Sequence, residues 1–456
     1  MKKLNKIYLM ALGTLLVLNA CNKQLDLKPY QSLDQTQAIQ TAQDVQITLI
    51  GAYNRAGLAD WYGGGVYLYP DLLGTQPYTI WQGTFTDLTN LTDQEPHIDD
   101  PEVNDMWYAA YRVINQANNV LANLSKVAAG DKDRTQGEAE FLRGMTYFDL
   151  VRIYGRQWGD GDANGNPGVP IVLTPTTSLG DASYVSRSSV AQVYAQAISD
   201  LSDAEAKLPE SNDVFATKYA AAAILARLYL QKQDYANALK EANAVITSGD
   251  FSLNKNYADE FPNPGQQHVD NTSEDVFAMQ VTAQQGVNNL NTFYASPDWG
   301  GRGDIIVKDS FVAGFEKGDA RAGMYNEDSG GTLYCDKFDN VDGNVHIIRL
   351  AELYLIRAEC NLRLSSATGA SPTKDISTIR NRAKLGSVTS VTLAQINTER
   401  LHELAFEGGF SLFDNKRLQQ KVYNLAWTDN YLVFPIPQVD LNANPKLVQN
   451  PGYGSH

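Results

Sequence analysis

The chain has 456 residues, with 52 acidic and 37 basic side chains and a formal net charge of −15 at pH 7. This acidity disfavours a nucleic-acid partner and excludes a broadly basic membrane-docking face. The length is compatible with two or three domains, but no linker rich in Pro, Gly or Ser divides the sequence. We therefore predict one large domain over residues 21–456, preceded by a signal segment.

Residues 1–20 have the order of parts typical of a bacterial lipoprotein signal. Lysines precede an apolar run from Ile7 to Leu18, which is too short for a stable membrane span but has the size of a secretory core region. Cys21 follows a small residue at once, so we predict cleavage before Cys21, lipidation of its thiol and a tether over 21–35. An ordinary secretory peptide that happens to end beside a cysteine is the alternative.

Helical periodicity recurs along the chain. In 219–246, small residues and Tyr229 and Tyr235 stand at the spacing of a tetratricopeptide helix pair, joined by a Gln-Asp turn. Further helices are predicted over 107–127, 137–155, 189–208 and 349–364. The sequence therefore predicts a mainly α, tetratricopeptide-like helical-repeat scaffold with long decorating loops and little β-structure.

Three long excursions interrupt these helices, at 57–101, 156–188 and 250–345. Each is far longer than an ordinary connection, and their many large aromatic residues are not typical of disorder. We therefore expect the binding function on these loops.

The second excursion begins like a calcium loop. Asp160, Asp162 and Asn164 occupy positions 1, 3 and 5 of an EF-hand pattern, but Ile171 stands where the bidentate Glu belongs. Calcium near these three residues is one interpretation, and a polar Gly/Asn turn is the other. No other cofactor and no metal site are predicted.

The remaining cysteines and several turns allow local predictions. Cys335 and Cys360 permit one disulfide, although the helical surroundings of Cys360 favour a buried thiol. Residues 338–347 read as a hairpin turned at Asp342-Gly343. Pro435 and Pro437 predict an extended, packed tail without helix.

Binding of a neutral sugar requires flat rings surrounded by planar polar groups, and two segments supply both. Segment 77–82 offers Tyr78 and Trp81, whereas segment 293–304 offers Tyr294, Asp298, Trp299 and Arg302. We predict that Trp81, Trp299 and Tyr294 converge into an aromatic cradle. Core packing is the alternative for each Trp, and for Trp61 it competes with an exposed or partner-facing position.

Catalytic motifs are lacking in the sequence. The segment 402–409, HELAFEGG, has no second histidine of a zinc-protease helix, and neither a nucleophile elbow nor a phosphate-binding loop occurs. We therefore predict a protein that is not an enzyme. A surface glycoside hydrolase would need a catalytic pair of carboxylates, and no other feature of the sequence supports such a pair.

Several segments together resemble the SusD/RagB family of surface lipoproteins, in the family's order: FLRGMTYFDLVRIYG, GVPIVLTP, the helices at 219–246, RLAELYLIRAE, ERLHELAFEGGFSLFDNKR (399–417) and LVFPIPQVDLNANPKLVQNPGY (432–453). In the fifth of these segments, Glu399, Glu403 and Glu407 stand at i, i+4 and i+8 and are expected to pair with basic groups.

The resemblance implies a tetratricopeptide-like scaffold that captures a nutrient at the cell surface and covers a SusC-like TonB-dependent transporter. It also implies a lipid-anchored, surface-exposed protein of the outer membrane, although the acidic cluster often linked to export does not follow Cys21. An oligosaccharide is the expected cargo. An oligopeptide, as in a RagAB-type peptide importer, is the alternative.

Overall fold

The computed structural model describes residues 39–176, 183–284 and 286–454. The predicted signal segment, the tether over 21–35 and the lipidation site at Cys21 lie outside the described residues. The mainly helical class is confirmed. The larger helices are α3 (Ala42–Ala56), α6 (Pro101–Ala122), α7 (Ala129–Tyr154), α8 (Val190–Lys207), α9 (Lys218–Gln231), α10 (Tyr235–Ser248), α13 (Leu350–Leu364), α14 (Pro372–Arg382), α15 (Leu393–Leu404) and α16 (Phe410–Arg417).

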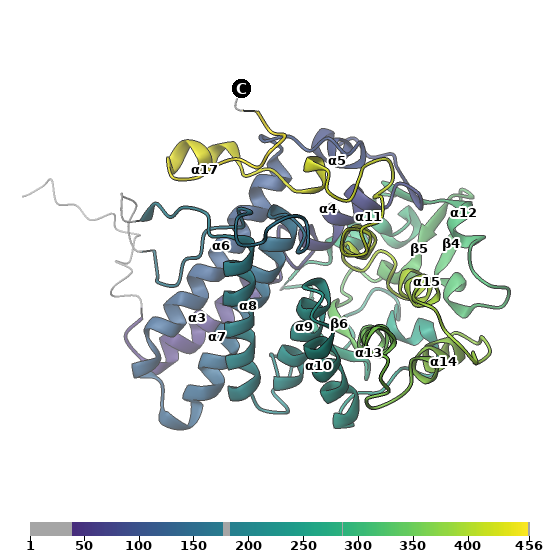
Figure 1. Cartoon of the computed structure of the whole chain (residues 1–456), viewed down its shortest axis with the longest axis horizontal. Coiled ribbons are helices and arrows are strands. Elements are labelled where there is room, and N and C mark those ends of the chain that lie inside the picture. Colours follow the sequence, from purple (N-terminus) through teal and green to yellow (C-terminus); the bar gives the residue numbers. More distant parts are fainter. Residues whose placement is uncertain (1–38, 177–182, 285, 455–456) are drawn as a thin grey trace, which may run out of the picture.

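These helices pack with their neighbours in the sequence and form a continuous layer. Helices α3, α6, α7 and α8 gather at one end of the molecule, α9 and α10 lie in the middle, and α13 and α14 complete the other end (Figure 1). None of the helices in the described ranges is both long enough and apolar enough to cross a membrane.

The predicted helix pair over 219–246 is confirmed as α9 and α10. Thr217 and Asp234 begin the two helices by accepting backbone N–H groups, and Gly249 ends the second in the left-handed conformation. The small residues of the pair are fully buried at the interface, as expected: Ala226, Ala238 and Ala242.

The excursions are less irregular than predicted. They contain short helices and strands, namely α4 (Gly65–Gly74), α5 (Thr86–Thr92), α11 (Asn289–Tyr294), α12 (Asp309–Val312), β1 (Thr79–Trp81), β2 (Asp275–Met279), β3 (Ile305–Val307), β4 (Tyr325–Glu327), β5 (Leu333–Cys335) and β6 (Val345–Arg349). In the described part of the chain the strands form two-stranded antiparallel sheets, β1 with β3, β2 with β6 and β4 with β5.

Two local predictions are wrong. A turn does occur at Asp342-Gly343, where the Gly343 N–H donates to the Asn340 carbonyl, but β6 pairs with the distant β2 and not in a local hairpin.

The tail packs as expected through buried Phe434 and Ile436, yet it contains helix α17 (Gln438–Ala443). Pro437 cannot continue a preceding helix but is well suited to start one, because its fixed φ costs nothing there.

Cys335 and Cys360 are both free, buried thiols. Cys335 lies on β5 and Cys360 on α13, so the prediction of a buried Cys360 thiol is confirmed and the alternative disulfide is not formed. Burial raises the pKa of each thiol well above its ordinary value.

A buried ion network holds the C-terminal helices onto the rest of the core. Glu403 accepts hydrogen bonds from Arg349 at 2.7 Å and from Arg382. Glu407 accepts from the Arg349 Nε and the Lys337 Nζ, each at 2.7 Å. The predicted pairing with basic groups is therefore confirmed for these carboxylates.

Glu399 takes part in the same network through Arg380 at 2.6 Å and Arg321 at 2.8 Å. The three carboxylates do not share one helix face, however, because α15 ends at Leu404 and Phe406 takes a positive φ of 67°. Glu407 thus reaches the network from the turn after the helix.

Candidate functional site

The pairing of β1 with β3 brings together the two segments expected to bind ligand. Trp81 lies opposite Ile305, and the Gln82 N–H donates to the Asp304 carbonyl at 2.9 Å. The Gln82 side chain adds a bond to the Gly303 carbonyl at 2.9 Å. The backbone of 79–82 therefore lies beside that of 303–307.

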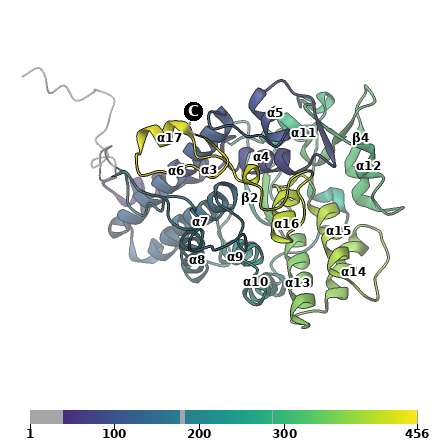
Figure 2. The same ribbon diagram turned by 45° about the horizontal axis from the view of Figure 1, so that its top comes forward.

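Three aromatic rings meet beside this strand pair. The ring centroids of Trp81 and Phe85 lie 6.2 Å and 6.1 Å from that of Phe293, which is buried beneath them. The Trp81 indole N–H donates to Thr89 Oγ1 at 2.9 Å, which fixes the orientation of its ring. In Figures 1 and 2, α4, α5 and α11 lie close together on one side of the helical layer. We call Trp81, Phe85 and Phe293 the aromatic platform.

Arg302 covers one edge of the platform. Its guanidinium carbon lies 4.9 Å from the Phe85 ring centroid, and its Nε donates to Asp304 at 2.7 Å. The side chain of Arg302 remains 43% exposed, and 37% of Phe85 is exposed. The Arg302 guanidinium therefore lies over the Phe85 ring, and both side chains are partly exposed at the surface.

A groove of about 320 Å³ opens next to the platform. Phe85, Phe293 and Arg302 form one wall, and carboxylates from two other segments, Asp60, Glu102 and Asp105, line the rest together with Asn289 and Thr292. Burial and the nearby charge of Asp60 raise the pKa of Asp105 above its ordinary value. The groove thus offers apolar rings, hydrogen-bonding groups and a net acidic lining.

Tyr294 does not belong to this surface, so its predicted place in the aromatic cradle is wrong. It is buried, and its hydroxyl donates to Asp71 Oδ2 at 2.9 Å. Asp71 also accepts the Gly409 N–H at 2.9 Å, and burial raises its pKa to about 7. Tyr294 therefore connects α11 to α4 inside the protein.

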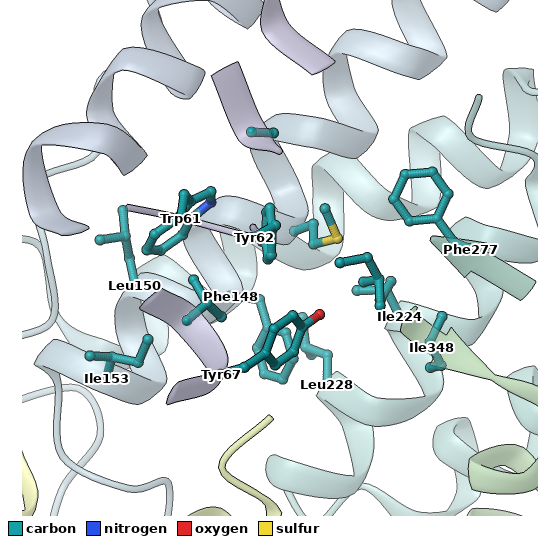
Figure 3. Close-up of a cluster of buried hydrophobic side chains, with 14 of the residues drawn as sticks. Trp61, Tyr62, Tyr67, Phe148, Leu150, Ile153, Ile224, Leu228, Phe277 and Ile348 are labelled. Carbon is teal, nitrogen blue, oxygen red and sulfur yellow. The ribbon is translucent and has the colours of Figure 1, made fainter. Parts of the chain in front are cut away.

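Trp61 is fully buried, so an exposed or partner-facing position is wrong for it. It lies in the core near Leu150 and Ile153, beside the Tyr62 ring at a centroid distance of 5.2 Å (Figure 3). The chain turns tightly after it, since a Cβ at Gly63 would stand 2.5 Å from the Gly57 carbonyl oxygen. This turn points the indole inward.

Tyr78 faces a different cavity from Trp81. It is half-buried, its ring lies 5.2 Å from that of Phe311, and it lines a pocket of about 240 Å³ together with Phe406 and Phe410. Tyr78 lies in the turn before β1, where its N–H donates to the Thr75 carbonyl, so its side chain is directed independently of that of Trp81.

Trp299 and Asp298 lie on an exposed turn after α11. Trp299 is 43% exposed, and within the described residues no ring contact joins it to Trp81, so their convergence stays a prediction. The Asp298 carboxylate accepts the N–H and the hydroxyl of Ser329 at 2.7 Å and 2.9 Å. Asp298 thus holds the β4–β5 turn in place.

Sequence reasoning missed Phe85 and Phe293. Phe293 directly precedes Tyr294, and only the phase of the short helix α11 decides which ring turns toward the platform. Phe85 stands between two threonines immediately before α5, where no periodic pattern singles it out.

The calcium interpretation gains no support from the loop around Asp160. Asp160 pairs with Arg156 at 2.7 Å, and Asp162 accepts the Asn164 N–H at 3.0 Å, as in an Asx turn. Gly159 and Gly161 take positive φ angles. These contacts are typical of a polar Gly/Asn turn, the alternative to a calcium loop.

Two family models that match different parts of the chain describe the same family. Residues 23–230 match a family model described as SusD-like, starch-binding and associating with the outer membrane, and residues 335–425 match the SusD family model. The chain belongs to the SusD/RagB family. Members of this family are non-catalytic binding proteins, so the prediction that the chain is not an enzyme is confirmed.

Individual relatives extend over nearly the whole chain. A SusD-like protein from Formosa agariphila is 24% identical over 99% of this chain and 100% of its own length. A SusD superfamily structure from Bacteroides thetaiotaomicron is 26% identical and has a TM-score of 0.78, covering 90% of this chain and 100% of that one. Surface glycan-binding protein A from Bacteroides uniformis shares the fold at 21% identity, with a TM-score of 0.75 and coverages of 90% and 99%.

Proposed function

We propose that the protein captures an oligosaccharide at the outer membrane and delivers it to a SusC-like TonB-dependent transporter. The observation that carries this proposal is the aromatic platform of Trp81, Phe85 and Phe293 with Arg302 at its edge. The family model that describes starch binding and outer-membrane association gives further support.

The chemistry of the groove favours a neutral glycan. The C–H face of a sugar ring is apolar and suits contact with the exposed part of Phe85 and the partly buried Trp81 beside it, whereas its hydroxyls need polar partners. Asn289, Thr292 and the carboxylates of the groove offer such partners. Because those carboxylates outnumber the one arginine, an anionic sugar would be repelled unless it contacted Arg302 alone.

The test measures glycan binding of the protein lacking residues 1–21 and of Trp81→Ala and Phe85→Ala variants. Loss of one aromatic anchor costs about 2 kcal/mol of binding free energy. This raises the dissociation constant by about thirty-fold. Tyr423→Asn is a matched control, since Tyr423 is 49% exposed at a positive φ that Asn tolerates. Unchanged affinity in both platform variants, with an intact circular dichroism spectrum, would reject the platform as the site.

An oligopeptide is the alternative cargo, and the same protein distinguishes the two. Affinity electrophoresis in gels containing polysaccharides is expected to retard the wild-type protein and not the Trp81→Ala variant. Calorimetry with pools of short peptides is expected to give no saturable heat. Peptide binding that depends on Trp81, without retardation by any glycan, would assign the site to peptides.

The proposal includes the lipid anchor at Cys21 and the transporter as partner. Two or three acyl chains hold a protein on a membrane far more firmly than one. Full-length protein is therefore expected in the outer-membrane fraction, and a Cys21→Ala variant is expected to leave that fraction in cells that lack the transporter. Copurification of a TonB-dependent transporter with the wild-type protein tests the partner separately.

A further inference from the structure

A histidine and two carboxylates meet at one end of the β2–β6 sheet, away from the aromatic platform. Glu260 ends the 3₁₀ turn Tyr257–Glu260, Asp275 begins β2, and His346 lies on β6. The His346 Nδ1 lies 2.5 Å from Asp275 Oδ1 and 3.6 Å from Glu260 Oε1. One ligand atom from each residue falls within 4.8 Å of the other two.

One oxygen of this cluster lacks a hydrogen-bond partner. Glu260 is fully buried, and its Oε2 accepts bonds from Asn254 at 2.6 Å and Thr272 at 2.5 Å. Its Oε1 finds no hydrogen-bond partner in the described residues and points toward His346. A buried carboxylate oxygen without a partner is costly, so its retention in the core needs a physical reason.

We propose that Glu260, Asp275 and His346 bind a divalent transition-metal ion, with Zn²⁺ as the best fit. Zinc binds imidazole nitrogen and carboxylate oxygen at about 2.0–2.2 Å, so tetrahedral ligand atoms stand about 3.3 Å apart. The separation of 3.6 Å between His346 and Glu260 already matches, and that between His346 and Asp275 needs to open by about 0.8 Å. Calcium is disfavoured because it takes oxygen ligands.

Two of the three proposed ligands, Asp275 and His346, border a small cavity. A pocket of about 20 Å³ is lined by Asp275, His346 and Thr272, among others. That volume holds a single water molecule, which would complete a tetrahedral zinc. The His346 side chain is 12% exposed, so the ion has a path from solvent.

The cations near Glu260, Asp275 and His346 are paired with other carboxylates, so they do not neutralise this cluster. The nearby cations Arg349 and Lys337 are engaged by other carboxylates, Arg349 by Glu274, Glu403 and Glu407, and Lys337 by Glu407. In the metal-bound form, with the imidazole neutral and both carboxyl groups ionised, Glu260 and Asp275 would supply two negative charges, which a divalent ion would balance.

A metal at this position would connect the turn at Glu260 to the β2–β6 sheet. The segment between Glu260 and Asp275 carries Gln266, whose side-chain amide donates to the Trp299 carbonyl at 3.2 Å. The ion would therefore stabilise a segment that contacts the exposed turn after α11, without taking part in ligand binding itself.

The experiment uses untagged protein lacking residues 1–21, stripped with EDTA and dialysed. Titration with ZnCl₂ in a calorimeter is expected to show one tight site, and the ion is expected to raise the melting temperature. His346→Gln and Glu260→Gln are each expected to weaken zinc binding by about 100-fold or more, since even outer partners of a metal site contribute 10–100-fold.

The control is the cluster of exposed His97 and Asp99 with buried Asp100, which also places three ligand atoms together. His97→Gln is expected to leave the tight site intact. Absence of saturable zinc binding in the wild-type protein, or loss of the tight site in His97→Gln and not in His346→Gln, would overturn the proposal. If the core variants fail to fold, anomalous diffraction at the zinc edge from wild-type crystals locates the ion or rejects the site.

Discussion

Glu403 is the carboxylate on which the buried ion network depends most, and its replacement gives a quantitative test. It accepts a hydrogen bond from Arg349 at 2.7 Å and one from Arg382, and it lies 3.6 Å from Arg321. Burial alone would raise the pKa of Glu403, but the charges of Arg382, Arg349 and Arg321 outweigh it and lower that pKa to about 2. The carboxylate is therefore ionised throughout the physiological range.

The contribution of Glu403 to the free energy of unfolding follows from this pKa. A fall from the ordinary value of 4.5 to about 2 corresponds to about 3 kcal/mol in favour of the folded state at pH 7. Removal of one partner from a buried ion pair costs about 3–5 kcal/mol in other proteins, which agrees. We expect Glu403→Gln to lower the free energy of unfolding by about 3 kcal/mol at pH 7.

The pH dependence separates this mechanism from a packing defect. Because the folded-state pKa of Glu403 is depressed, its stabilisation is fully present above pH 4.5 and is lost as the pH falls toward 2. The difference between wild-type protein and Glu403→Gln is therefore expected to shrink to less than half by pH 3.

Urea unfolding followed by tryptophan fluorescence at pH 7 and pH 3 measures both quantities. Glu327→Gln on the exposed part of β4 makes the same chemical change and is expected to alter stability by less than about 0.5 kcal/mol. A cost in Glu403→Gln equal to that of the control, or one that does not change between the two pH values, would refute the reasoning.

Two further predictions concern the platform and the thiols. A Cβ at Gly83 would stand 2.3 Å from the Trp81 ring, so Gly83→Ala is expected to displace the indole and weaken retardation in glycan gels, whereas Gly130→Ala, with open space around it, is expected to have no effect. Cys335 and Cys360 are buried and free, so a thiol reagent is expected to label neither in the native protein lacking residues 1–21 and both in urea. Rapid labelling of the native protein would contradict their burial.

The long helices were predictable because each carries its own signal. An apolar stripe over three or more turns, as in α6 and α8, needs no knowledge of the rest of the chain. Strand pairing is different, because β6 pairs with β2 some seventy residues earlier and not across the nearby Asp342-Gly343 turn. A turn-forming dipeptide favours a hairpin locally, but the burial of both strands in the core decides the partner.

The composition of the two segments was enough to choose them as candidates for binding, but it did not indicate which of their side chains reach the surface. Phe293 and Tyr294 are neighbours on α11, and one residue along a helix rotates the side chain by about 100°. The deciding contact is Asp71, a buried carboxylate that needs donors and takes the Tyr294 hydroxyl at 2.9 Å. Because a phenylalanine cannot satisfy Asp71, the tyrosine turns inward and Phe293 is left to form the floor beneath Trp81 and Phe85.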